Sequence, residues 1–230
     1  MYTNSNLAKK MNYQTSIAAS VLLQCKTVVE KEDFVSTGIL TYAEGDVIEV
    51  EIAEYKLFDL GKPVKLTVYS KAGIYVFHTM VVAKDRGAIM VLNPPDNRKK
   101  FKEQRETTRV QVDCKGILLR DHASKDNPDN EPIALSLKNI SLSGMGLAVY
   151  AYEPIPVGSQ MSVRVDIGFP LTCRVEIIRC EFIGQGHYYG VRMLSLTSEQ
   201  TSAIRAFIVK TQTVTYFSKK KDDASKAAEE

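Results

Sequence analysis

The sequence predicts a mainly β protein with two small β-barrel domains in tandem, the second closed by a C-terminal α-helix. Three observations predict this fold. Short segments in which apolar and polar residues alternate recur along the chain between Gly-containing turns, which is typical of small barrels and sandwiches. Two prolines within residues 93–97 interrupt the pattern and divide it into two sets. A single stretch, residues 197–208, has the spacing of an amphipathic helix.

The first domain is predicted at residues 21–96, after a polar and flexible N-terminus at residues 1–20. Strands are expected throughout residues 33–93. Turn signals at 61–63, 71–73 and 85–87 separate the alternating segment 64–69 from the apolar runs 74–83 and 88–92. Residues 97–109 then form a basic interdomain linker.

The second domain is predicted at residues 110–217, and the charged segment 218–230 is expected to be a disordered tail. Its expected strands are 110–119, 132–140, 161–167, 171–182 and 188–194, with a polar loop at 121–132 and a hairpin turn at 184–186. Thr197 and Gln200 have the spacing of a capping box, which marks the start of a helix. Ile204, Phe207 and Ile208 form the apolar stripe of that helix.

Composition and charge exclude several classes of protein. The chain has 230 residues, of which 44% are hydrophobic and 25% charged, so it has enough apolar material for a core and is not a disordered chain. The formal net charge of +3 argues against a protein that coats DNA. No apolar run approaches the ~18–20 residues that span a bilayer, so no transmembrane segment is predicted. The sequence contains no Walker A, HExxH or GxSxG motif, and no enzymatic activity is predicted.

The four cysteines, Cys25, Cys114, Cys173 and Cys180, include no CxxC pair, and the three histidines lie far apart in the sequence. This spacing predicts neither a metal site nor a disulfide framework. Reduced thiols are expected, which favours a cytoplasmic location.

The positive charge is concentrated in the linker. Residues 98–109 contain six basic and two acidic side chains, so this segment carries +4 and the rest of the chain −1. Arg105 and Arg109 lie on one side of the chain whether it is helical or extended. Arginine can bind phosphate or guanine with two parallel hydrogen bonds and can stack on a base. A solvated linker would explain the same composition.

A second polar segment follows an apolar strand, at residues 139–146. Asn139 and Ser141 face the same side of an extended chain. Gly144 and Gly146 allow the backbone to turn and a ligand to approach closely. A polar hairpin turn without a ligand is the alternative.

Together, these two segments resemble the PilZ domain, a family that binds the bacterial second messenger cyclic di-GMP. The resemblance rests on RETTR at 105–109 and NISLSG at 139–144, in that order. YGVRM at 189–193 and the terminal helix extend the similarity, so that it covers about residues 98–215. The preceding β-domain resembles the N-terminal, PilZN-like domain of flagellar-brake-type PilZ proteins.

The resemblance implies a binding site for cyclic di-GMP and no other cofactor. Arg105 and Arg109 would contact guanine and phosphate, Asn139 and Ser141 would bind polar groups of the ligand, and Gly144 would leave room for it. In the family, the position of Gln104 influences whether one nucleotide or a stacked pair binds. Lys102 and Arg98 would add phosphate contacts, and Gly146 is a further candidate.

The sequence therefore predicts a receptor for cyclic di-GMP in which the nucleotide orders the linker and re-orients the domains. The expected output is regulation of motility or biofilm through a protein partner, such as a flagellar motor component. A PilZ-like interaction module without nucleotide binding is the alternative. A binder of single-stranded nucleic acid is disfavoured, because no spread basic face with aromatic residues is evident. Ligand stoichiometry and the choice between a monomer and a homodimer stay open.

Overall fold

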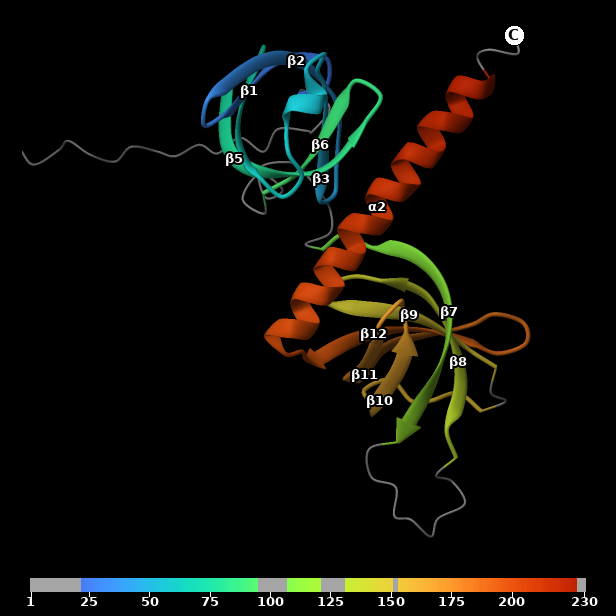
Figure 1. Ribbon diagram of the computed structural model, residues 1–230. Coiled ribbons are helices and arrows are strands. Elements are labelled where there is room, and N and C mark those ends of the chain that lie inside the picture. The colour runs from blue at the N-terminus through green and yellow to red at the C-terminus, as the bar shows by residue number, and fades with distance from the viewer. Residues whose placement is uncertain (1–21, 95–106, 121–130, 151–152, 227–230) are drawn as a thin grey trace, which may run out of the picture. The chain divides into compact units, whose positions relative to one another are not determined.

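The computed structural model describes residues 22–94, 107–120, 131–150 and 153–226 (Figure 1). The described strands form two closed antiparallel barrels, each with its own hydrophobic core, and a C-terminal helix follows the second barrel. This confirms the predicted fold class. The predictions for residues 1–20, for the loop at 121–130 and for most of the linker lie outside the described residues.

The first barrel contains six strands and one short 3-10 helix. These are β1 (Cys25–Lys31), β2 (Phe34–Glu44), β3 (Val47–Glu51), η2 (Tyr55–Leu57), β4 (Pro63–Ser70), β5 (Gly73–Asp85) and β6 (Ala88–Leu92). The strand order is β1-β2-β3-β6-β5-β4, and β1 pairs with β4 to close the barrel. The expected alternation of β4 is present, because Val64, Leu66 and Val68 are buried in the core.

The sequence pattern predicts that the strands begin at residue 33. Strand β1 lies before this residue and was not predicted. Only Thr27 and Val29 are fully buried in this strand, so its local apolar signal is short. Its extended form is stabilised by pairing on both sides, because Val28 lies opposite Thr37 of β2 and Thr67 of β4. Such pairing between distant segments does not show in a local pattern.

The second barrel contains six strands in the order β10-β11-β12-β9-β8-β7. They are β7 (Val110–Arg120), β8 (Ile133–Ile140), β9 (Gly144–Val149), β10 (Gln160–Asp166), β11 (Pro170–Phe182) and β12 (His187–Ser195). Strand β9 lies between β8 and β12, and all six of its residues are buried. The central position of β9 brings the segment 139–146 next to β12.

Helix α2 (Ser198–Lys226) begins as the capping box predicts. The backbone N–H of Thr197 donates to Oε1 of Gln200 (3.0 Å), and the backbone N–H of Gln200 donates to Oγ1 of Thr197 (3.1 Å). Ile204 and Ile208 are buried in the core of the second barrel, and Phe207 packs edge-to-face on Phe169.

The helix is longer than the sequence pattern predicts, because it continues to Lys226, within the segment 218–230 that is expected to be disordered. Residues 218–226 contain neither Gly nor Pro. Once a helix has been nucleated, each further residue adds one hydrogen bond, so residues with high helix propensity, such as Lys and Ala, extend it readily. The charge of the segment therefore does not stop the helix. No helix among the described residues is long and apolar enough to span a membrane.

Candidate functional site

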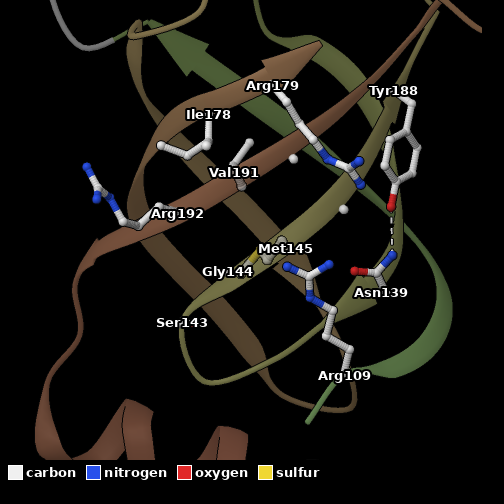
Figure 2. A pocket seen from close by; sticks show the side chains of 12 residues that line it. Arg109, Asn139, Ser143, Gly144, Met145, Ile178, Arg179, Tyr188, Val191 and Arg192 are labelled. Atoms are coloured by element: carbon white, nitrogen blue, oxygen red, sulfur yellow. Dashed lines mark hydrogen bonds between the residues drawn. The ribbon is translucent and has the colours of Figure 1, made fainter. Parts of the chain in front are cut away.

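A cavity of about 300 Å³ lies on the side of the second barrel (Figure 2). We call it the Asn139 cavity. It is lined by residues from the start of β7, from the β8–β9 hairpin and from strands β11 and β12: Arg109, Asn139, Ser143, Gly144, Met145, Gly146, Ile178, Arg179, Tyr188, Gly190, Val191 and Arg192. Three of these lining residues are arginines and none is acidic, so the cavity favours an anionic ligand.

The cavity brings together four of the residues singled out in the sequence. Arg109, Asn139, Gly144 and Gly146 all line it, although 30 residues separate Arg109 from Asn139. They meet because β7 pairs with β8 in a register that places Val110 opposite Ile140, at the end of the strands where Arg109 enters. Arg105, Gln104, Lys102 and Arg98 lie outside the described residues.

Ser141 does not line the cavity. Its side chain is fully buried, and its Oγ accepts the backbone N–H of Gly144 (3.2 Å) and of Ser143 (3.4 Å). The backbone N–H of Ser141 donates to the carbonyl oxygen of Gly144 (2.9 Å), which closes the turn between β8 and β9. Ser141 therefore holds the turn that carries the cavity residues.

We expect Ser141→Ala to lower the free energy of unfolding by about 1–2 kcal/mol, because the buried N–H of Gly144 loses a hydrogen-bond acceptor. Urea denaturation measures the change. Ser136→Ala is the matched control, since the Ser136 hydroxyl donates to Asp113 at the surface. Equal stability of the two variants would contradict the role of Ser141 in the turn.

The turn also positions the segment that precedes β7. The hydroxyl groups of Thr107 and Ser143 form a hydrogen bond of 2.8 Å. This bond ties the backbone two residues before Arg109 to the β8–β9 hairpin. The arginine is therefore anchored beside Asn139 by the hairpin as well as by strand pairing.

Asn139 and Tyr188 meet inside the cavity. The Nδ2 of Asn139 donates to the hydroxyl oxygen of Tyr188 (2.7 Å), and the Oδ1 points toward the guanidinium of Arg109 (Figure 2). This orientation leaves an acceptor oxygen on the Arg109 side of the cavity.

Gly146 makes the contact between Asn139 and Tyr188 possible. It lies between Asn139 of β8 and Gly190 of β12 in the strand register. A Cβ atom at this position would collide with the Tyr188 hydroxyl and with the Asn139 amide. The absence of a side chain at Gly146 thus opens the space that the two polar side chains share.

Sequence reasoning missed Arg179 and Tyr188. The guanidinium of Arg179 lies over the Tyr188 ring, 5.6 Å from its centroid, within the range of a cation–π interaction. A signal for Arg179 exists in the sequence, because the alternation of Val175 and Ile177 breaks at Ile178, which is exposed in the structure. Tyr188 carries no comparable signal, since it belongs to a regular strand and becomes notable only beside Asn139.

The neighbouring Tyr189 points the other way. It is fully buried, and its hydroxyl oxygen accepts the backbone N–H of Ile155 (2.9 Å). Burial raises the pKa of the Tyr189 phenol, so this side chain stays neutral and packs in the core.

The cysteines do not form a reactive or metal-binding cluster in the described part of the chain. All four are free thiols, and burial raises the pKa of Cys173 to about 11. Among the described residues, no group of three or more His, Cys, Asp or Glu side chains could hold a metal ion.

The comparison with families of known proteins gives a match that covers the second barrel. The family model described as the PilZ domain matches residues 103–210. No protein of curated function matches the sequence.

Several solved structures resemble the chain at low sequence identity. The inhibitor of motility MotI/DgrA of Bacillus subtilis is 11% identical, with 83% of this chain and 97% of that chain covered and a TM-score of 0.41. YcgR of Escherichia coli, in complex with c-di-GMP, is 13% identical, with 88% of each chain covered and a TM-score of 0.42. The MrkH–c-di-GMP complex of K. pneumonia is 11% identical, with 86% and 90% covered and a TM-score of 0.38.

Proposed function

Since this chain is a PilZ-domain protein, with the family match at residues 103–210, we propose that it is a receptor for cyclic di-GMP and that the nucleotide binds in the Asn139 cavity. One observation carries the proposal. Arg109 from the first PilZ motif and Asn139 and Gly144 from the second line one cavity that also contains two further arginines and no acid. The proposal assigns no catalytic role to any residue.

Each residue has a role that follows from its chemistry. Cyclic di-GMP has two phosphates and two guanines. The guanidinium of Arg109 can donate to a phosphate or a guanine and can stack on the base. The Oδ1 of Asn139 can accept hydrogen bonds from guanine N–H groups. Gly144 and Gly146 leave room for the base, and Ser141 acts through the turn.

The linker residues complete the proposed site. Arg105 would share a face with Arg109 and contact the other side of the nucleotide. Lys102 and Arg98 would add contacts to phosphate. Gln104 would influence whether one nucleotide or a stacked pair binds.

Calorimetric titration with cyclic di-GMP tests the proposal. We expect saturable binding, and the stoichiometry distinguishes one nucleotide from a stacked pair. Titration with GMP, which carries the same base but a single phosphomonoester, is the control and should give much weaker binding. A titration of the folded protein without heat, and without competition against a labelled nucleotide, would leave the protein-interaction module as the better description.

We also propose that cyclic di-GMP acts as a switch in a cytoplasmic receptor. Binding would order the basic segment 98–109, which follows a Pro-Pro break, and would change the arrangement of the two barrels. The output would be regulation of motility or biofilm through a protein partner, for which a flagellar motor component is the first candidate.

Small-angle scattering with and without the nucleotide checks the switch. We expect the radius of gyration or the shape of the distance distribution to change at saturating ligand. The Arg109→Ala variant at the same nucleotide concentration serves as the control and should scatter like the free protein. Superimposable curves for the free and the saturated wild-type protein would reject the change of arrangement while leaving the binding site intact.

A further inference from the structure

We propose that Arg179, which belongs to neither motif, binds the nucleotide in the Asn139 cavity, and that Glu181 competes with the nucleotide for its guanidinium. The inference rests on the proposed function of the cavity, because it assigns a partner for the ligand's phosphate. In the free protein, the carboxylate of Glu181 neutralises the charge of Arg179. The ligand must displace this carboxylate before it can bind the Arg179 guanidinium.

A break in strand β11 directs Arg179 into the cavity. The pairing of β11 with β12 shifts register between Ile177 and Arg179, which is a β-bulge or a similar irregularity. Ile177 is buried, whereas both Ile178 and Arg179 are exposed, so two successive side chains leave the core side of the strand. Bulges commonly re-aim a side chain beside a functional site.

The strand opposite is shaped to receive the arginine. Gly190 of β12 lies directly across from Arg179. A Cβ atom on Gly190 would lie 2.7 Å from both Cγ and Nε of Arg179, so a side chain at this position would push the arginine aside. The stem of Arg179 therefore lies against the bare backbone of β12 and extends toward the ring of Tyr188.

The guanidinium of Arg179 faces the middle of the cavity. Figure 2 shows the guanidinium groups of Arg179 and Arg109 approaching the cavity from opposite ends, with Asn139 and Tyr188 along one side. Stacking on Tyr188 holds the Arg179 fork in place. A ligand with two phosphates could thus meet one guanidinium at each end.

Glu181 holds the same guanidinium in the free protein. Its Oε1 lies 2.7 Å from Nη1 of Arg179, and the side chains of Glu181 and Arg179 are 56% and 51% exposed, respectively. Exposed ion pairs contribute little to stability, because water competes for both charges. Glu181 accepts one hydrogen bond from Arg179, whereas a phosphate can accept two parallel ones from the same fork, so a phosphate can displace the carboxylate.

Arg192 and Glu176 provide an internal comparison. They form a second ion pair at 2.6 Å, which joins β12 to β11, whereas Arg179 and Glu181 both belong to β11. The Arg192 side chain, however, points away from the middle of the cavity in Figure 2. Removing the Glu176 carboxylate therefore changes the charge beside the cavity by the same amount, but the cation that it frees, Arg192, lines the cavity without facing its middle.

Calorimetric titration of cyclic di-GMP into variants of the full chain tests the inference. We expect Arg179→Ala to weaken binding about tenfold or more, as for the loss of a charged hydrogen bond. Glu181→Gln should instead tighten binding about 1.5- to fivefold, the size of the exposed pair that it removes. The variant with both substitutions should bind like Arg179→Ala, because Glu181 acts only through Arg179. Glu176→Gln should leave the affinity unchanged.

The outcomes separate the inference from the proposed function. Absence of binding by the wild-type chain would overturn both. Binding by the wild type with unchanged affinity in Arg179→Ala would overturn only the inference. Equal tightening in Glu181→Gln and Glu176→Gln would show a general charge effect and overturn the competition. Thermal unfolding of each variant confirms that it is folded, which is expected because the three substituted side chains lie on the surface of the sheet.

Discussion

Arg109→Ala is expected to weaken the binding of cyclic di-GMP by about 1.5–3 kcal/mol, the range for hydrogen bonds to charged groups. Arg109 lines the Asn139 cavity and, within the described part of the chain, forms no ion pair. Among the described residues, no carboxylate has to be displaced from its guanidinium before it binds a ligand. Calorimetric titration gives the change in affinity directly.

Two variants make the Arg109 experiment specific. Arg164→Ala removes the same charge from an exposed position of β10 that does not line the cavity, and its affinity should equal that of the wild type. Arg109→Lys keeps the charge but loses the planar fork, so it should recover only part of the lost affinity. Unchanged affinity in Arg109→Ala would reject the proposed site.

Gly146→Ala is expected to weaken nucleotide binding by about 1–3 kcal/mol, which is typical of an extra methyl group in a packed site. The new Cβ would collide with the Tyr188 hydroxyl and the Asn139 amide. Both are ends of side chains, so they can move away and the barrel stays folded. The movement would break their hydrogen bond and shift the Oδ1 acceptor of Asn139.

Gly144→Ala provides the contrast for this prediction. A Cβ atom at Gly144 would collide with the carbonyl oxygen of Val191, which is backbone of the neighbouring strand and cannot rotate away. Gly144→Ala should therefore lower the Tm of the protein, whereas Gly146→Ala should lower the affinity at nearly unchanged Tm. Wild-type affinity in Gly146→Ala would show that the contact between Asn139 and Tyr188 is not needed for binding.

Much of the fold was predictable because strand and helix signals are local. The burial of alternate residues in β4 follows from the sequence of that segment alone. The capping box of α2 involves two residues only three positions apart. Strand β1 was harder to predict, because its local pattern is weak and pairing with distant strands stabilises it. The full length of α2 was harder to predict, because the charged C-terminal residues extend a helix that has already formed.

The candidate site was predictable where its residues belong to short motifs. Arg109, Asn139, Gly144 and Gly146 were singled out in the sequence and line one cavity. Ser141 was also singled out, but its hydroxyl faces the turn, because the backbone N–H groups of the hairpin need an acceptor.

The sequence by itself determined the barrel segments, the capped helix and the motifs that point to an anionic nucleotide, because each depends on residues close together in the chain. Only the tertiary structure decided which side chains share the cavity. The hydrogen bond between Asn139 and Tyr188 joins residues 49 positions apart, and the register of β8, β9 and β12 sets their distance. Arg179 reaches the same cavity because a register shift in β11 turns its side chain toward β12, where Gly190 has no side chain in its way. These relations arise from pairing between strands, and no single segment of the chain contains them.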